Sequence, residues 1–160
     1  KGVPELKKSV NGLKELGSVG RISSIYSVVG NSRSPENIHD IRTHGSYIGL
    51  SLALTLDTEL SATRLLDEIQ KIEEFLTSEV NRRMVEIILV VYEGESVMTP
   101  KLTLPYPDLI QRPDLAVPAA EIWGDFYHPV HKESLTALAK KSAANSWGEF
   151  YAHSKSALDF

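Results

Sequence analysis

Three stretches of the sequence carry the hydrophobic patterns of β-strands. Residues 48–57 alternate apolar side chains with small or polar ones, which predicts a strand that is covered on one face. Residues 19–29 are rich in isoleucine, valine and tyrosine, and residues 85–92 are almost wholly apolar, as in a strand covered on both faces. A turn at Glu93-Gly94 is expected to lead into a short partner strand at residues 96–98.

Helical periodicity is clearest in two other stretches. Residues 4–16 place their leucines and a valine on one stripe, with Pro4 in the first turn and Gly17 after the last. Residues 61–76 repeat apolar side chains with the same period, and Ser61 is suited to cap that helix. A third, alanine-rich helix is predicted at about residues 132–146.

Long polar or proline-containing stretches separate these elements. Residues 30–44 predict a loop of the length usually reserved for function or disorder, and residues 100–129 are punctuated by prolines that favour short helices. After the last helix the tail carries Trp147, Phe150, Tyr151 and Phe160. A solvated tail does not need so many aromatic residues, so we expect it to dock in cis or on a second subunit.

The order of elements, helix, strand, strand, helix, strand, predicts an α+β fold with helices on one face of a mainly antiparallel sheet. It corresponds to a ferredoxin-like βαββαβ domain whose first strand is absent from this chain. The C-terminal helix is then an addition to that domain.

Composition narrows the classes of function. The chain of 160 residues is 42% hydrophobic and 24% charged, which is typical of a globular domain. Its formal net charge of -4 argues against nucleic acid and anionic membranes as partners. Cysteine is absent, which excludes disulfides, thiolate zinc sites and a cysteine nucleophile. No apolar run is long enough to span a bilayer, and we expect a cytoplasmic protein.

Several segments together resemble the 6-hydroxymethyl-7,8-dihydropterin pyrophosphokinases, enzymes of folate biosynthesis. The segments that carry the resemblance are Ser23-Ser24-Ile25-Tyr26-Ser27, Tyr47-Ile48-Gly49, Leu65-Leu66-Asp67 through Glu73, Arg83-Met84-Val85-Glu86-Ile87-Ile88-Leu89, and Tyr106-Pro107-Asp108-Leu109-Ile110-Gln111-Arg112. Their order and spacing, rather than any single motif, indicate a divergent member. The resemblance implies a pyrophosphokinase-like domain over residues 1–131, followed by the helix and aromatic tail over residues 132–160.

The resemblance also implies a reaction in which ATP gives its terminal pyrophosphoryl group to the hydroxymethyl group of a pterin. Such a transfer depends on magnesium ions and on basic groups that position the phosphates. Carried over onto this sequence, the catalytic positions are Arg83 and Glu86, the nucleotide-binding positions are Gln70, Glu73, Arg82, Tyr106 and Arg112, and the pterin-binding positions are Tyr47 and Gly49. Glu86 is also the implied metal ligand.

The chain departs from the family pattern at several of these positions. The family holds magnesium with two aspartates two residues apart on a strand, and here these positions are Glu86 and Ile88, of which isoleucine has no ligand atom. Gly49 replaces an asparagine that reads the pterin ring, and Asp114 replaces a stacking aromatic residue. The basic loop that closes over ATP is reduced to residues 77–82.

The residues that are kept also have structural interpretations. Gln70 and Glu73 lie three apart on a helix, as on an ordinary solvated face. Glu86 within an apolar strand should meet a cation, either a metal ion or the guanidinium of Arg83 or Arg112. Arg112 itself can bind phosphate bidentately or clamp a loop.

Two further questions stay open at the level of sequence. The absent first strand would lie in the middle of the sheet, so it is supplied by preceding residues, by another segment, or by strand exchange in a dimer. The chain is either a divergent ATP- and Mg2+-dependent pyrophosphokinase that binds pterin and ATP, or a catalytically inactive homologue that acts as a binding, regulatory or scaffold protein. A homo-oligomer is compatible with both.

Overall fold

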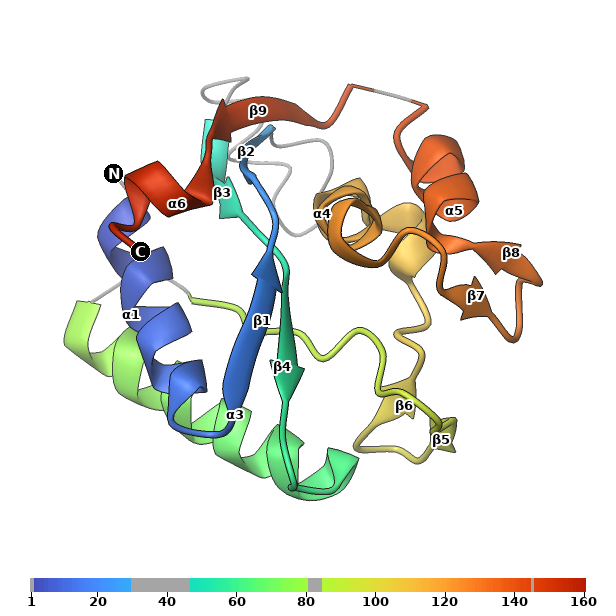
Figure 1. Cartoon of the computed structure of the whole chain (residues 1–160), viewed down its shortest axis with the longest axis horizontal. Coiled ribbons are helices and arrows are strands. Elements are labelled where there is room, and N and C mark those ends of the chain that lie inside the picture. Colours follow the sequence, from blue (N-terminus) through green and yellow to red (C-terminus); the bar gives the residue numbers. More distant parts are fainter. Residues whose placement is uncertain (1, 30–46, 81–84, 145) are drawn as a thin grey trace. The chain divides into compact units, whose positions relative to one another are not determined.

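A computed structural model of the chain describes residues 2–29, 47–80, 85–144 and 146–160 (Figure 1). These residues form two compact units, one made of residues 1–20 and 55–107 and the other of residues 21–54 and 108–160. The elements are α1 (Val3–Lys14), β1 (Ser18–Ile22), β2 (Ile25–Val29), β3 (Tyr47–Ser51), β4 (Leu54–Asp57), α3 (Ala62–Val80), β5 (Val97–Met98), β6 (Thr103–Leu104), the 3-10 turn η3 (Leu109–Gln111), α4 (Pro113–Trp123), β7 (Tyr127–His128), β8 (Glu133–Ser134), α5 (Leu135–Ser142), β9 (Gly148–Ala152) and α6 (Ser154–Ala157).

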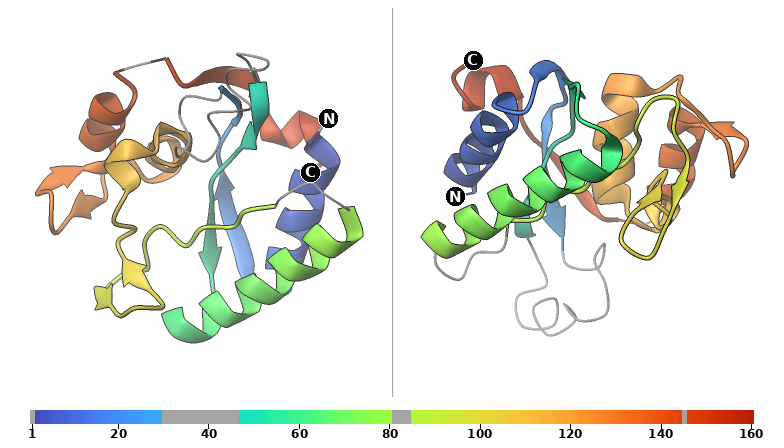
Figure 2. Two further views of the ribbon diagram at one scale, coloured as in Figure 1. Left: turned by 180° about the vertical axis from the view of Figure 1, so that it is seen from behind. Right: turned by 90° about the horizontal axis from the view of Figure 1, so that it is seen from below.

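In the first unit, α1 packs along α3, and β1 pairs with β4 (Figure 2). The two helices come close at Gly12, where a β-carbon would lie 3.1 Å from the Ile72 side chain. Both helices agree with the periodicity of the sequence. Val10 and Leu13 of α1 are buried, and the Ser61 hydroxyl accepts the Arg64 N–H at 3.3 Å at the start of α3.

Residues 85–92 do not form the predicted strand. They run as an extended segment whose backbone pairs with no strand among the described residues. The Ile87 N–H bonds to a side chain, that of Glu73, and the Val90 carbonyl accepts the Tyr106 N–H at 2.8 Å. Apolar burial alone therefore predicts an extended backbone here, but a strand also needs a neighbour that exchanges hydrogen bonds with it.

The extended segment is held on the small core of the first unit. Leu89 and Tyr92 pack against buried Ala62, Leu102 and Leu104. The expected turn at Glu93-Gly94 is present, since Tyr92 and Glu95 form an isolated bridge and Gly94 has a φ of 77°. The short strand that follows differs from the prediction, because β5 pairs with β6.

The second unit contains a three-stranded sheet of order β3-β2-β9 (Figure 1). Both pairings are antiparallel, with Val28 of β2 opposite Gly49 of β3 and opposite Gly148 of β9. The C-terminal tail thus docks in cis, as one of the two expected alternatives. Trp147 is buried, and its ring lies 5.6 Å from the Tyr26 ring between centroids.

Helices α4 and α5 pack against each other in the second unit, with η3 beside them. Leu109, Ala116, Leu135 and Leu138 are each at most 1% exposed and form the centre of this packing. The last predicted helix is real but shorter than expected, because Ser134 caps it by accepting the Ala137 N–H at 3.1 Å.

Each of the two long predicted strands is divided in two. The first is interrupted at Ser23-Ser24 and the second at Leu52-Ala53. Ser23 occupies this break completely buried, and its hydroxyl accepts the Ala53 N–H at 2.8 Å while its own N–H donates to the Ala53 carbonyl at 2.8 Å. The side-chain hydroxyl takes the place of a regular ladder bond, so the pairing changes at this point.

The described residues have the mixed character of an α+β fold, with five α-helices and small antiparallel sheets. The single ferredoxin-like sheet is not confirmed, because the predicted strand at residues 85–92 is not a strand. The predicted loop at residues 30–44 lies outside the described residues. Within the described part of the chain, no helix has the length and apolar character needed to cross a bilayer.

Glu121 on α4 ties that helix to β2. One carboxylate oxygen accepts both the N–H and the hydroxyl of Ser24 at 3.0 Å, and the other accepts the Tyr26 hydroxyl at 2.6 Å. Burial, and then the hydrogen bond and charge of Glu121, raise the pKa of Tyr26 to about 12. The carboxylate therefore accepts three hydrogen bonds, two from Ser24 just before β2 and one from Tyr26 on β2.

We expect Glu121→Ala to lower the free energy of unfolding by about 1–2 kcal/mol, because three donors lose a charged acceptor at a partly solvated site. Urea denaturation measures this change. Asp125→Ala, which removes another exposed carboxylate close by in the chain, is the matched control and should have little effect. Equal stability of the two variants would contradict the role of Glu121.

Candidate functional site

In the first unit, Glu73 connects α3 to the extended segment. Its side chain is half-buried, and its Oε2 atom accepts the Ile87 N–H at 2.6 Å. Burial is the main cause that raises the pKa of Glu73 above its usual range; the charges of Glu86 and Glu74 act in the same direction, and the Ile87 hydrogen bond opposes them. Glu73 and Glu86 are therefore close enough to interact electrostatically.

Glu86 is exposed, contrary to the expectation of a carboxylate buried within a strand. The segment is covered less completely than a central strand would be, and the neighbouring side chains of Val85 and Ile87 are half-buried. Its exposure leaves Glu86 hydrated, so it does not require a buried counter-ion. Ile88 is half-buried and contributes no oxygen.

The other predicted site residues of this unit differ in their exposure. Gln70 is exposed on α3, three residues before Glu73, while Tyr106 is half-buried and donates its backbone N–H to the Val90 carbonyl. Arg82 and Arg83 lie outside the described residues. The structure thus brings Glu73, Glu86 and Tyr106 to the same extended segment.

We expect Glu73→Gln to be more stable than the wild type at neutral pH, by a margin that is smaller at acid pH. The amide oxygen can still accept the Ile87 N–H, and the partly buried negative charge is removed. Because the pKa of Glu73 is raised in the folded state, its contribution to stability is full below the ordinary value of 4.5 and is lost as the pH rises through the folded pKa.

The measurement is urea denaturation of both proteins over a pH series. The difference in unfolding free energy, variant minus wild type, should increase as the pH rises above about 4.5. A difference that is independent of pH would show that the pKa of Glu73 is not raised.

In the second unit, Arg112 is bound by a carboxylate of its own chain. Its Nε donates to Asp114 Oδ1 at 3.0 Å and its Nη2 to Asp114 Oδ2 at 2.9 Å, a two-point pair. The side chain of Asp114 is 2% exposed and that of Arg112 is 16% exposed. The Ser51 hydroxyl, at the end of β3, donates to the Asp114 carbonyl oxygen at 2.6 Å, so the start of α4 is tied to the sheet.

The pairing of Asp114 with Arg112 is a contact that the sequence analysis misses. The sequence analysis treats Asp114 as the loss of an aromatic ring, whereas its carboxylate holds the arginine that the family resemblance assigns to the nucleotide. The signal was the spacing, since an acid two residues after an arginine, at the first turn of a helix that begins with Pro113, can reach back to it.

Gly49 and Tyr47 both lie on β3, with Gly49 opposite Val28 and Tyr47 opposite Val29. Among the described residues, none lies within 4 Å of a β-carbon built at Gly49. As far as these residues are concerned, a side chain can be added at this position.

We expect Asp114→Ala to lower the free energy of unfolding by about 2–4 kcal/mol, because it leaves the largely buried guanidinium of Arg112 without its carboxylate. Urea denaturation is the measurement. The matched control is Asp67→Ala, which removes the carboxylate of the exposed Lys101–Asp67 pair and should change stability little. A similar loss in both variants would contradict a special role for the Arg112–Asp114 pair.

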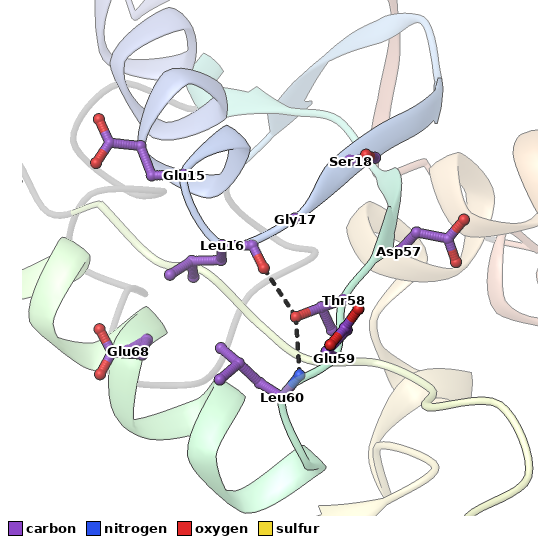
Figure 3. A pocket seen from close by; sticks show the side chains of 9 residues that line it. All are labelled: Glu15, Leu16, Gly17, Ser18, Asp57, Thr58, Glu59, Leu60 and Glu68. Atoms are coloured by element: carbon purple, nitrogen blue, oxygen red, sulfur yellow. Dashed lines mark hydrogen bonds between the residues drawn. The ribbon is translucent and has the colours of Figure 1, made fainter.

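The first unit also has an acidic hollow of about 740 Å³ between α1, the end of β4 and α3 (Figure 3). Its wall is organised by Thr58, whose hydroxyl donates to the Leu16 carbonyl at 2.8 Å and accepts the Leu60 N–H at 3.2 Å. Glu15 and Asp57 lie on opposite sides of it and do not converge (Figure 3). Among the described residues, no three acidic or histidine side chains gather as a metal site.

Comparison with the sequences of known proteins finds two similar proteins with the same name, both pterin pyrophosphokinases. The chain is 32% identical over 92 residues to the 2-amino-4-hydroxy-6-hydroxymethyldihydropteridine pyrophosphokinase of Haemophilus influenzae, which covers 55% of this chain and 57% of that protein. It is 26% identical over 136 residues to the enzyme of the same name from Aquifex aeolicus, and this alignment covers 80% of this chain and 76% of that protein.

The first match thus spans little more than half the length of the relative. No model of a known protein family matches the chain. The two similarities support a divergent member of the pyrophosphokinase family, in agreement with the resemblance drawn from the motifs. Neither favours the alternative of a non-catalytic binding protein.

Proposed function

We propose that this chain carries out the reaction for which its two relatives are named, the transfer of pyrophosphate from ATP to the hydroxymethyl group of a dihydropterin. The observation that carries the proposal is the agreement between two relatives of the same name and the ordered motifs of the sequence. In this reaction the pterin hydroxyl oxygen bonds to the β-phosphorus of ATP, the bond from that phosphorus to the AMP oxygen breaks, and the hydroxyl proton is released. The proposed enzyme is cytoplasmic.

The carboxylate oxygens of the first unit suit one magnesium ion that arrives with the nucleotide. Glu86 is exposed and lies near Glu73, while Ile88 supplies no oxygen. Magnesium commonly takes one or two carboxylates and completes its shell with water and phosphate oxygens. When bound, it neutralises charge that develops on the transferring phosphates. Glu86 is the proposed ligand, and Glu73 holds the extended segment that carries it.

Arg112 is the proposed phosphate-binding residue of the second unit. Its guanidinium has the planar donor geometry that matches phosphate oxygens, and Asp114 already uses two of its donors. Asp114 therefore positions the arginine and competes with the nucleotide for it. We expect weaker nucleotide binding than an unpaired arginine would provide.

β3 is the proposed pterin-binding strand of the second unit. The described residues leave room beside Gly49, and Tyr47, two residues earlier, has an aromatic ring of the kind that stacks on a flat heterocycle. Gly49 lacks a side chain that can read the hydrogen-bonding edge of the ring, so we expect modest affinity for the pterin.

The test is the release of AMP by the purified protein with ATP, magnesium and 6-hydroxymethyl-7,8-dihydropterin. We expect one AMP for each pyrophosphorylated pterin formed, and at least a tenfold slower rate for Glu86→Ala, about 1.4 kcal/mol in the barrier. Glu93→Ala removes another exposed carboxylate just beyond the same segment and should leave the rate unchanged. No AMP above a blank without pterin would overturn the proposed function.

Two gain-of-function variants test the site itself. Ile88→Asp adds a carboxylate two residues from Glu86 and should lower the magnesium concentration needed for half-maximal rate. Gly49→Asn enters space that the described residues leave free and should lower the KM for the pterin without changing that for ATP. If AMP is released but neither variant has its effect, the reaction stands and the assignment of these positions is wrong.

A further inference from the structure

β2 lies between β3, the proposed pterin-binding strand, and β9 (Figure 1). Val28 of β2 is opposite Gly49 of β3 on one side and opposite Gly148 of β9 on the other. Val29 of β2 is opposite Tyr47 of β3. The two residues of β2 that pair with the proposed pterin-binding positions therefore lie where β9 begins.

The pairing of β2 with β3 is irregular at the same place. β3 has one extra residue, Ile48, between the partners of Val28 and Val29. A bulge of this kind interrupts the regular hydrogen bonds of a ladder and is common beside functional sites. The positions of Tyr47 and Gly49 therefore depend on how firmly β2 itself is held.

Trp147, the residue directly before β9, holds β2 from the other side. Its carbonyl oxygen accepts the Val29 N–H at 2.7 Å. Its side chain is buried, with the residue 8% exposed, and its ring lies near the ring of Tyr26 on the same strand. Because a tryptophan removes a large apolar area from water, its burial fixes the point at which β9 joins the sheet.

Gly148 allows β9 to lie close against β2. A β-carbon at this position would lie 2.0 Å from the Ser27 carbonyl oxygen and 3.3 Å from the Val28 Cα atom. Both are backbone atoms, so a side chain at position 148 cannot be accommodated unless the strands move apart. Gly148→Ala is therefore a specific way to loosen β9 from β2 without altering β3.

We propose that Trp147 and Gly148 are positioning residues for pterin binding. They hold β2, and β2 in turn holds Tyr47 and Gly49 of β3 in the arrangement that the pterin meets. The inference rests on the proposed function, in which β3 binds the pterin. It assigns to β9 a contribution to substrate affinity that is made through the sheet rather than by contact with the substrate.

Amide hydrogen exchange followed by NMR tests the positioning without any substrate. Gly148→Ala should speed exchange about tenfold or more at Val29 and at residues 47–51, because loosening β9 weakens both pairings of β2. Glu149→Ala is the matched control, since Glu149 is exposed at the next position of β9, and it should leave these rates unchanged. Unchanged exchange at residues 47–51 in Gly148→Ala would overturn the proposal, whatever happens in β2.

Steady-state kinetics test the consequence for the substrate. Trp147→Ala and Gly148→Ala should each raise the KM for the pterin about fivefold or more and leave the KM for ATP unchanged, because the Arg112–Asp114 pair forms at the start of α4. Trp147→Phe keeps a buried aromatic ring and should retain most of the affinity. Equal changes in both KM values, or none, would contradict the inference.

The two measurements separate this inference from the proposed function. Circular dichroism verifies that each variant is folded, and a general loss of folded protein would lower the rate rather than raise one KM. If neither the wild type nor any variant releases AMP, the proposed function fails. The exchange rates at residues 47–51 then still decide whether β9 positions β3.

Discussion

The main constraint on the first unit is that the backbone groups of residues 85–92 need hydrogen-bond partners, although no strand among the described residues pairs with them. Residues 85–92 are apolar enough to be held against the core, as Leu89 and Tyr92 are, yet no strand among the described residues pairs with them. A buried N–H without an acceptor costs about 1–3 kcal/mol. The Glu73 carboxylate accepts the N–H of Ile87 and so holds the segment beside α3. Glu86 directly precedes Ile87 and is therefore held near Glu73.

The second unit uses polar side chains in the same way. Asp114 binds Arg112, and Glu121 accepts hydrogen bonds from Ser24 and Tyr26. The first link lies at the start of α4 and the second in its last turn, where it joins the helix to Ser24 and Tyr26. Charged residues at positions where the family resemblance implies ligand binding therefore also stabilise the fold. A ligand that binds Arg112 acts on a contact that the folded chain already uses.

Local patterns in the sequence predicted the elements that depend on local interactions. α1 and α3 need only an apolar stripe and suitable end residues, such as Pro4 and Ser61, so their positions could be derived. The break at Ser23 depends on a hydrogen bond to Ala53, thirty residues away, and no local pattern contains it. The strand predicted at residues 85–92 failed for the same reason, since burial is visible in a sequence but a pairing partner is not. In the candidate site, the sequence analysis missed the capture of Arg112 by Asp114, although the spacing of the two residues at the start of α4 permits it.

In the proposed function, the Arg112–Asp114 pair limits how the phosphates of a nucleotide can reach Arg112. If a phosphate displaces Asp114 from Arg112, a carboxylate that is almost fully buried loses its partner. The free energy of this loss reduces the free energy of phosphate binding. If the phosphate instead binds without displacing Asp114, the pair stays intact and Asp114 holds the guanidinium in one orientation, which reduces the entropy lost on binding. The Ser51 hydroxyl bonds to the backbone carbonyl of Asp114, so the tie between α4 and β3 is the same in both routes. The second route avoids the cost of displacing a buried carboxylate, and in that route Asp114 is a positioning residue rather than only a competitor.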